Sequence, residues 1–236
     1  MNSPQRLQAK LADKLVHNDK FTQYFFTLVH PHTLNFDPGQ YVSMVVDANG
    51  DRRSYSIASK PENKDAFELL IDHSPAGVGS TYLANLQIGQ EVDILAPMGR
   101  FIFQREGSEA ELVFVATGSG VAPFRSMIMS LLQEGIEKRP ITLYWGMRFV
   151  EDLFWLDEWQ DLAESYSNFM FHPVISRAMD EWPLCRGRVT DCLNIHEIPI
   201  DAGYYLCGNN TMIAEVTNLL MGKGVAKENI HFEKFY

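Results

Sequence analysis

A cation, an aromatic ring and two hydroxyls occur within four consecutive residues, Arg53-Ser54-Tyr55-Ser56. Strong strand-forming residues surround this segment, and neighbouring side chains on a strand point to opposite faces. The Arg53 guanidinium can fork onto phosphate oxygens, and the Tyr55 ring can lie against a planar ligand. The hydroxyl of Ser56 can hydrogen-bond a ring nitrogen. The pattern suits a phosphorylated planar ligand, and an ordinary exposed strand is the alternative.

A second segment, Gly77-Val78-Gly79-Ser80-Thr81, leads into a short apolar periodic run at 80–86 that predicts a helical turn. Glycines let a backbone approach a ligand closely, and a helix N-terminus offers free amides to an anion. The alternative is a glycine-rich turn in which Ser80 is an ordinary N-cap. Beside Arg53, this segment would supply a second phosphate contact, and two such contacts suit a pyrophosphate.

Two further segments follow predicted strands in the second half of the chain. Ala116-Thr117-Gly118-Ser119-Gly120-Val121-Ala122-Pro123 places a glycine loop and a helix start after a buried strand, where doubly wound folds bind nucleotides. Pro123 replaces the third glycine of a dinucleotide fingerprint, and no Gly-Lys pair follows as in a P-loop. The second segment, Cys207-Gly208, again ends a strand and opens a helix. Cys207 could face the ligand crevice or be an ordinary buried cysteine.

The first hundred residues are typical of an antiparallel barrel or sandwich. Glycine- and proline-rich turns, including one at 97–99, separate short segments rich in branched and aromatic residues. These predicted strands lie at 11–16, 21–29, 41–46, 54–58, 67–71 and 91–95.

After about residue 106 strands and helices alternate, which predicts a doubly wound α/β sheet. The predicted strands lie at 112–116, 141–145, 169–175 and 204–207, and the helices at 123–133, 156–165 and 212–221. The polar stretch 104–109 marks the boundary between the strand-rich first part of the chain and this α/β part. We therefore expect a first domain at 1–105 and a second at 106–236.

Composition excludes some function classes. The chain has 236 residues and a net charge of -10, from 30 acidic and 20 basic residues, whereas a nucleic-acid binder needs a basic stripe. No apolar run approaches the roughly 20 residues of a membrane helix, and the N-terminus lacks a signal-peptide core. Cys185, Cys192 and Cys207 form no CxxC pair and are odd in number, which predicts no disulfide framework. We expect a cytoplasmic monomer that binds neither nucleic acid nor membrane.

Together the four segments resemble the ferredoxin–NADP reductase superfamily, whose members pair an FAD-binding barrel with an NAD(P)-binding doubly wound domain. The resemblance covers nearly the whole chain. The family's flavin motif Arg-x-Tyr-Ser/Thr is matched by Arg53, Tyr55 and Ser56, and its pyrophosphate motif Gly-x-x-Ser is matched by Gly77 and Ser80. Its nicotinamide loop Gly-Thr/Ser-Gly-x-Ala-Pro is matched by Gly118 to Pro123, and its Cys-Gly pair by Cys207 and Gly208.

This resemblance implies an enzyme in which NAD(P)H gives a hydride to flavin N5. Ser56 would then hydrogen-bond near N5, and Cys207 would align the nicotinamide. The family often ends with a carboxylate and an aromatic residue, which implies Glu233 and either Phe235 or Tyr236 here. No metal is implied.

Four residues in the second half are candidates for a ribose phosphate, namely Arg148, Ser176, Arg177 and Arg188. Ser176 and Arg177 follow a predicted strand, close to where relatives contact this phosphate. Guanidinium groups suit a phosphate dianion, which favours NADPH over NADH. The same arginines could instead be solvated or contact the pyrophosphate of NADH.

The electron acceptor has two candidates: a protein partner such as a ferredoxin or an oxygenase component, or free flavin that leaves once reduced. The pyrophosphate site at 77–81 favours held FAD over FMN or riboflavin. Three cysteines cannot bind a four-cysteine iron–sulfur cluster, so such a centre would belong to another chain. A non-catalytic flavin-binding regulator is a third possibility, against which Ser56, Cys207 and Glu233 speak.

Overall fold

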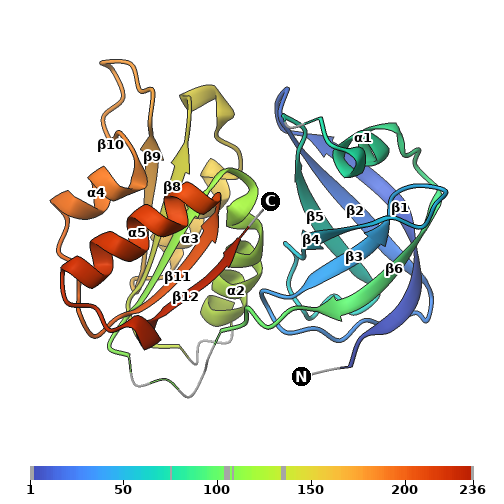
Figure 1. Cartoon of the computed structure of the whole chain (residues 1–236), viewed down its shortest axis with the longest axis horizontal. Coiled ribbons are helices and arrows are strands. Elements are labelled where there is room, and N and C mark those ends of the chain that lie inside the picture. The colour runs from blue at the N-terminus through green and yellow to red at the C-terminus, as the bar shows by residue number, and fades with distance from the viewer. Residues whose placement is uncertain (1–2, 75, 104–106, 108, 134–136, 235–236) are drawn as a thin grey trace. The chain divides into compact units, whose positions relative to one another are not determined.

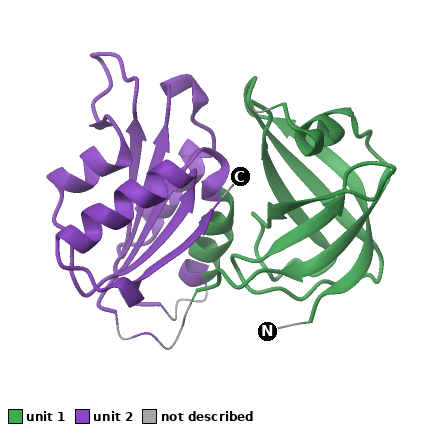
Figure 2. Cartoon of the chain, in the orientation of Figure 1, with its two compact units in different colours: residues 1–103, 122–130 green, residues 104–121, 131–236 purple. Residues whose placement is uncertain are grey.

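The computed structural model describes residues 3–74, 76–103, 107, 109–133 and 137–234. The chain divides into two compact units, a first unit of residues 1–103 and 122–130 and a second unit of 104–121 and 131–236 (Figure 2). The expected boundary between residues 105 and 106 falls in 104–106, which lies outside the described residues.

The first unit is a nearly closed antiparallel barrel with the strand order β4-β3-β6-β1-β2-β5 (Figure 1). A bridge between Ile57 and Leu69 connects the exit of β4 to β5 and so links the two ends of the sheet. One helix, α1 (Val78–Asn85), is inserted between β5 and β6. The strands are β1 (Gln5–Val16), β2 (Phe21–His30), β3 (Tyr41–Val45), β4 (Arg52–Ser56), β5 (Ala66–Asp72) and β6 (Glu91–Met98).

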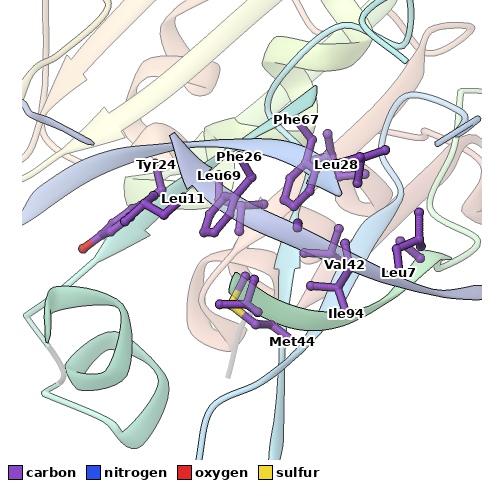
Figure 3. Packing of buried hydrophobic residues seen from close by; sticks show 14 of the residues in the cluster. Leu7, Leu11, Tyr24, Phe26, Leu28, Val42, Met44, Phe67, Leu69 and Ile94 are labelled. Atoms are coloured by element: carbon purple, nitrogen blue, oxygen red, sulfur yellow. The ribbon is translucent and has the colours of Figure 1, made fainter. Parts of the chain in front are cut away.

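Alternate residues of these strands fill the barrel, as Figure 3 shows. Val42 and Met44 of β3 and Leu7 and Leu11 of β1 point inward, whereas their neighbours are partly or fully exposed. Burying each such side chain contributes about 1.5–3 kcal/mol, which fixes which face of each strand is internal. The register of β3 then places Tyr55 opposite Val42 on the neighbouring strand β4.

The second unit is a parallel sheet with the strand order β10-β9-β8-β7-β11-β12. Its strands are β7 (Leu112–Thr117), β8 (Ile141–Met147), β9 (Phe169–Ile175), β10 (Cys185–Arg186), β11 (Gly203–Gly208) and β12 (Ile230–Lys234). Its helices include α3 (Leu156–Ser165), α4 (Val189–Ile195) and α5 (Asn210–Gly222), while α2 (Val121–Gln133) lies largely within the first unit.

Helices cover both faces of this sheet. Trp159 of α3 packs on Phe169 and Phe171 of β9. On the opposite face, Tyr144 and Val115 belong to a core that includes residues of α4 and α5. A strand that is buried on both faces has a continuous apolar sequence, and β7 is such a strand.

The expected fold class, a barrel followed by a doubly wound domain, is confirmed, with local corrections. Strand β6 continues through Pro97 to Met98, where the sequence indicated a turn, and β10, α4 and β12 were not predicted. Helix α1 begins at Val78 with Gly77 as its N-cap, so Ser80 lies inside the first turn and is not the cap. In the described part of the chain, no helix is long and apolar enough to cross a membrane.

Candidate functional site

Strand β4 and helix α1 bring the first two sequence motifs together. A Cβ added to Gly79 would lie 2.1 Å from the Tyr55 hydroxyl oxygen and 2.9 Å from Cγ of Arg53. Real Cβ atoms essentially never show contacts below 3.0 Å, so only glycine fits at position 79 without a shift. Arg53, Tyr55 and the start of α1 therefore form one surface, as the motifs predicted.

The Tyr55 hydroxyl is buried and has no hydrogen-bond partner among the described residues. Burial raises the pKa of Tyr55 to about 12, although the charge of Arg53 opposes this rise. The phenol is therefore neutral near pH 7 and keeps a proton to donate. A buried polar atom without a partner points to a missing group, such as a ligand.

The other candidate residues of this unit differ in exposure. Ser56 is buried at the end of β4, opposite Tyr41, whereas Ser54 is exposed. The exposed Arg53 guanidinium donates to the Arg52 carbonyl oxygen at 2.8 Å. The Ser80 hydroxyl donates to the Gly77 carbonyl oxygen at 3.1 Å.

Helix α1 offers its first-turn amides to a ligand. No side chain of the described residues caps this helix, and its N-cap Gly77 is extended. The amide of Thr81 already donates to the Gly77 carbonyl at 2.9 Å, so the amides ahead of it carry the free donor capacity. This arrangement, with Arg53 beside it, fits an anionic group.

In the second unit, the ends of β7 and β11 meet at two glycines. A Cβ on Gly120 would lie 2.3 Å from the Cys207 carbonyl oxygen, and a Cβ on Gly208 would lie 2.3 Å from Oγ1 of Thr117. The Thr117 hydroxyl is buried and unpartnered within the described structure. A second narrow cradle with an unsatisfied polar atom thus lies at the carboxyl edge of the parallel sheet.

The loop between β7 and α2 is held in place from the sheet. Gly118 adopts a φ of 56°, a conformation that favours glycine, and its carbonyl accepts from Nε1 of Trp145 at 3.0 Å. Pro123 lies in the first turn of α2, where its missing amide leaves no helical bond unmade.

Strand register places Cys207 directly beside Glu233 of β12. Cys207 is fully buried, and burial together with the charge of Glu233 raises the pKa of its thiol well above the usual value. Cys207 is therefore a neutral thiol near pH 7. Phe235 and Tyr236, the two candidate terminal aromatics, lie outside the described residues.

The four candidates for a ribose phosphate lie along the carboxyl ends of β8, β9 and β10. The amides of Ser176 and Arg177 donate to the carbonyl oxygens of Met147 and Arg148, both at 2.9 Å. The two strand ends therefore run side by side. The Arg177 guanidinium lies 5.7 Å from the centre of the Phe149 ring.

Arg188 follows β10 on the same edge, and its guanidinium pairs with Glu215 of α5 at 2.8 Å. The Arg188 guanidinium is therefore already paired with a carboxylate, a contact that the sequence did not indicate.

Sequence reasoning missed Arg125. This nearly buried guanidinium on α2 donates to the Ala58 carbonyl at 3.0 Å and pairs with Glu68 at 2.8 Å. It thereby holds the chain just after Ser56. A cation within the apolar sequence of α2 was the available signal.

The sequence predicted no disulfide framework, but the structure contains a disulfide. Cys185 of β10 and Cys192 of α4 are disulfide-bonded, with their Cα atoms 5.7 Å apart. The turn that joins β10 to α4 brings them together, and the sequence predicted neither of these two elements.

Two family models match the chain in this order. Residues 8–103 match the oxidoreductase FAD-binding domain, and residues 114–218 match the oxidoreductase NAD-binding domain. The chain belongs to the ferredoxin–NADP reductase superfamily. Its two domains are those of a flavin-dependent NAD(P)H reductase.

Several reductases are similar to this chain, and at least two of them are longer than it. The propane 2-monooxygenase reductase component of Gordonia sp. (strain TY-5) is 31% identical over 214 residues, which are 88% of this chain and 61% of that protein. The structure of the Amycolatopsis cytochrome P450 reductase GcoB has a TM-score of 0.89 and 26% identity, with 98% of this chain and 70% of that one covered. A ferredoxin NADP+ reductase from Neisseria gonorrhoeae, with bound FAD and NADP, has a TM-score of 0.83 at 22% identity, covers both chains fully and shows the shared fold. The chain therefore spans about three fifths of the monooxygenase component's length.

The residues present fit both cofactors. In the first unit the unpartnered Tyr55 hydroxyl and the Gly79 cradle lie beside a cation and free amides, which suits a flavin dinucleotide. In the second unit the unpartnered Thr117 hydroxyl lies against Gly208, which suits a nucleotide that approaches this edge of the sheet closely.

Proposed function

We propose that this chain oxidises NAD(P)H with a tightly held FAD and passes the electrons to a protein acceptor. The observation that carries the proposal is the pair of cradles, Tyr55 against Gly79 and Thr117 against Gly208, each with a buried hydroxyl in need of a partner. Bound FAD supplies a ring that accepts a hydride and releases electrons singly.

In the first unit the side chains would orient the flavin. Arg53 and the first-turn amides of α1 would bind the pyrophosphate, and the Tyr55 ring would contact the flavin ring. The neutral Tyr55 hydroxyl donates a hydrogen bond, since its pKa of about 12 keeps it protonated. Ser56, buried at the strand end, hydrogen-bonds near N5.

In the second unit the backbone would orient the nucleotide. Gly118 and Gly120 let the pyrophosphate approach the loop closely, and the Thr117 hydroxyl bonds the nucleotide. The Cys207 thiol, kept neutral by its raised pKa, bounds the nicotinamide pocket without adding a charge. Glu233 lies beside it, and its carboxylate would orient the nicotinamide amide.

The nucleotide proposed is NADPH. Arg148 and Arg177 are exposed at adjacent strand ends, and Arg188 lies on the same edge, so three guanidinium groups are available to a ribose phosphate. The pairing of Arg188 with Glu215 weakens its share.

The acceptor proposed is an oxygenase component. The Gordonia relative is named as a monooxygenase reductase component, and the Amycolatopsis neighbour as a cytochrome P450 reductase. An acidic ferredoxin is disfavoured because the chain carries a net charge of -10, and few cations, among them Lys60, Lys64 and Arg100, lie near the flavin motifs in sequence. Release of free reduced flavin is disfavoured by the pyrophosphate cradle at α1.

The test begins with the purified protein, which should be yellow and release FAD on denaturation. NADH and NADPH are then titrated, with ferricyanide, free flavin, a ferredoxin and an oxygenase component as acceptors. Stopped-flow rates with ferredoxin should depend only weakly on salt, since steering by opposite charge is absent. Bound FMN alone, no turnover with ferricyanide, or a fast and steeply salt-sensitive reaction with ferredoxin would each contradict a stated part of the proposal.

A further inference from the structure

A disulfide lies at the edge of the parallel sheet, and its two halves differ in exposure. Cys192, in the first turns of α4, is fully buried, whereas Cys185 on the edge strand β10 is partly exposed. Of the two cysteines, Cys185 is therefore the one that an incoming reagent can approach.

Cys185 opens onto a cavity of about 470 Å³. Its wall combines the apolar side chains of Leu184 and Ile195 with the imidazoles of His172 and His196 and with Arg186. A small thiol carrying a carboxylate would find room there and, in Arg186, a half-exposed guanidinium that it would share with Asp180. The opening leads to a sulfur atom, not to the candidate cofactor cradles.

A histidine lies beside the buried sulfur. Nδ1 of His196 is 3.8 Å from the Cys192 sulfur and 2.9 Å from the Cys192 carbonyl oxygen. The hydrogen bond to a carbonyl requires the proton on Nδ1, since a carbonyl only accepts. A proton donor is thus within reach of the sulfur that would leave when the disulfide opens.

We propose that Cys185–Cys192 is a redox-active disulfide that exchanges with a small anionic thiol. The thiolate attacks the Cys185 sulfur, the sulfur–sulfur bond breaks, and the electron pair leaves on Cys192 as a thiolate. The Nδ1–H of His196 stabilises this thiolate by hydrogen bonding, and the proton that the incoming thiol released completes the Cys192 thiol. A second thiolate then attacks the external sulfur of the mixed disulfide. Two thiols become one external disulfide, and both cysteines become thiols.

The same turn carries residues at the proposed nucleotide edge. The Gly187 amide donates to the Ile175 carbonyl at 3.0 Å, next to Ser176. The Arg188 amide donates to the Asp191 carboxylate at 2.7 Å, one residue before Cys192. Opening the disulfide therefore loosens the turn that presents Arg188, and we expect weaker nucleotide binding; this second part rests on the proposed function.

The first experiment does not need enzyme activity. The full protein is treated with reduced glutathione, quenched with iodoacetamide under native conditions and mapped by mass spectrometry. We expect a Cys185–Cys192 crosslink before treatment and glutathione on Cys185 alone during it. The buried Cys207 is the internal control and should stay unlabelled until denaturation.

Variants test the mechanism. With oxidised glutathione as the reagent, Cys192→Ser should collect glutathione on Cys185 and release one reduced glutathione, whereas Cys185→Ser should leave Cys192 unmodified. His196→Gln should keep the disulfide and slow its opening at least about tenfold. His32→Gln, a change at an exposed histidine of the first unit, should have no effect.

Several results would overturn the exchange site, and none depends on the cofactors. They are glutathione on Cys192, a disulfide that resists glutathione in the native protein, or about one bound zinc per chain with both cysteines reduced. Zinc is the alternative because Cys185, Cys192 and His196 offer three ligand atoms within 4.8 Å.

The coupling to nucleotide binding is read separately in the wild-type protein. Reduction should raise KM for the nucleotide about fivefold and leave the flavin spectrum unchanged. An unchanged KM after proven reduction would overturn the coupling alone. An absence of nucleotide oxidation in both redox states would instead contradict the proposed function.

Discussion

The candidate flavin residues lie on strand β4 at one end of the barrel sheet, whereas the candidate nucleotide residues follow the buried parallel strands β7 and β11. In the barrel, the chemistry is carried by side chains, namely the guanidinium of Arg53, the phenol of Tyr55 and the hydroxyl of Ser56. In the parallel sheet, it is carried mainly by backbone at Gly118, Gly120 and Gly208.

The difference follows from the strands. An antiparallel strand at a sheet end exposes alternate side chains, so ligand groups can be added without disturbing the core. A central parallel strand is buried on both faces and reaches solvent only at its carboxyl end, where glycine is needed for a close approach. Substitutions should therefore act through lost side-chain bonds in one unit and through steric conflict in the other.

The largest steric effect is expected from Gly120→Ala. Its Cβ would lie 2.3 Å from the Cys207 carbonyl oxygen and 2.7 Å from the carbonyl carbon, and a strand backbone cannot rotate away. Overpacking of this kind costs about 1–3 kcal/mol. We expect KM for the nucleotide to rise at least about tenfold, with flavin occupancy unchanged.

The matched control is Gly222→Ala in α5, where a Cβ meets nothing within 4 Å. That variant should be as stable as the wild type or slightly more so. Chemical denaturation and steady-state kinetics measure both variants. Equal kinetics in the two would show that the Gly120 approach is not part of the nucleotide site.

Gly79→Ala should reduce flavin occupancy, because its Cβ would lie 2.1 Å from the Tyr55 hydroxyl. The tyrosine must move, and with it the surface proposed for the flavin. Gly222→Ala, where a Cβ also has open space, is the control and should retain the flavin. Tyr55→Phe removes the conflicting oxygen, so the double variant should recover part of the occupancy. If it binds no more flavin than Gly79→Ala alone, the steric explanation is wrong.

Arg53→Ala and Cys207→Ala test the proposed roles of the two units separately, flavin binding in the first and hydride transfer in the second. The arginine is proposed to bind a phosphate, and a hydrogen bond to a charged group is worth about 1.5–3 kcal/mol. Flavin should therefore bind roughly 10- to 150-fold more weakly in Arg53→Ala. Cys207→Ala should keep its flavin and slow its reduction about tenfold in stopped-flow absorbance. Equal flavin loss in both variants would mean that the roles are misassigned.

The smallest effect concerns Arg188. Its exposed pair with Glu215 is worth about 0.2–1 kcal/mol, so Glu215→Gln should release the guanidinium and lower KM for NADPH about twofold. KM for NADH should not change, because NADH lacks the ribose phosphate. Arg188→Ala should raise KM for NADPH alone. Parallel changes for both nucleotides would place Arg188 at a shared part of the cofactor.

Much of the fold and of the site residues was predictable from local pattern. Segments rich in branched and aromatic residues between turn formers indicated the barrel strands, the continuous apolar run at 112–116 indicated β7, and glycine spacing indicated the loop after it. These features depend on neighbours within a few residues, where side-chain periodicity and backbone freedom act directly. The nearness of Arg53 and Tyr55 to α1 was inferred from shared chemistry and is present in the structure.

Other features depended on elements with little sequence signal. Strand β10 has two residues and α4 has seven, too few for a clear period, so the Cys185–Cys192 bond could not be foreseen. Arg125 reaches Glu68 across 57 positions, a contact that no local pattern encodes.

By itself, the sequence determined which residues can do chemistry and the order of the two units. Only the tertiary structure decided that the Tyr55 and Thr117 hydroxyls are buried without partners and that Cys207 lies beside Glu233. Burial and strand pairing are set by segments far apart in the chain, and burial in turn sets the pKa of Tyr55 and of Cys207. Residue type gives a group its chemistry, whereas its protonation and its unmet hydrogen bonds come from what the fold packs around it.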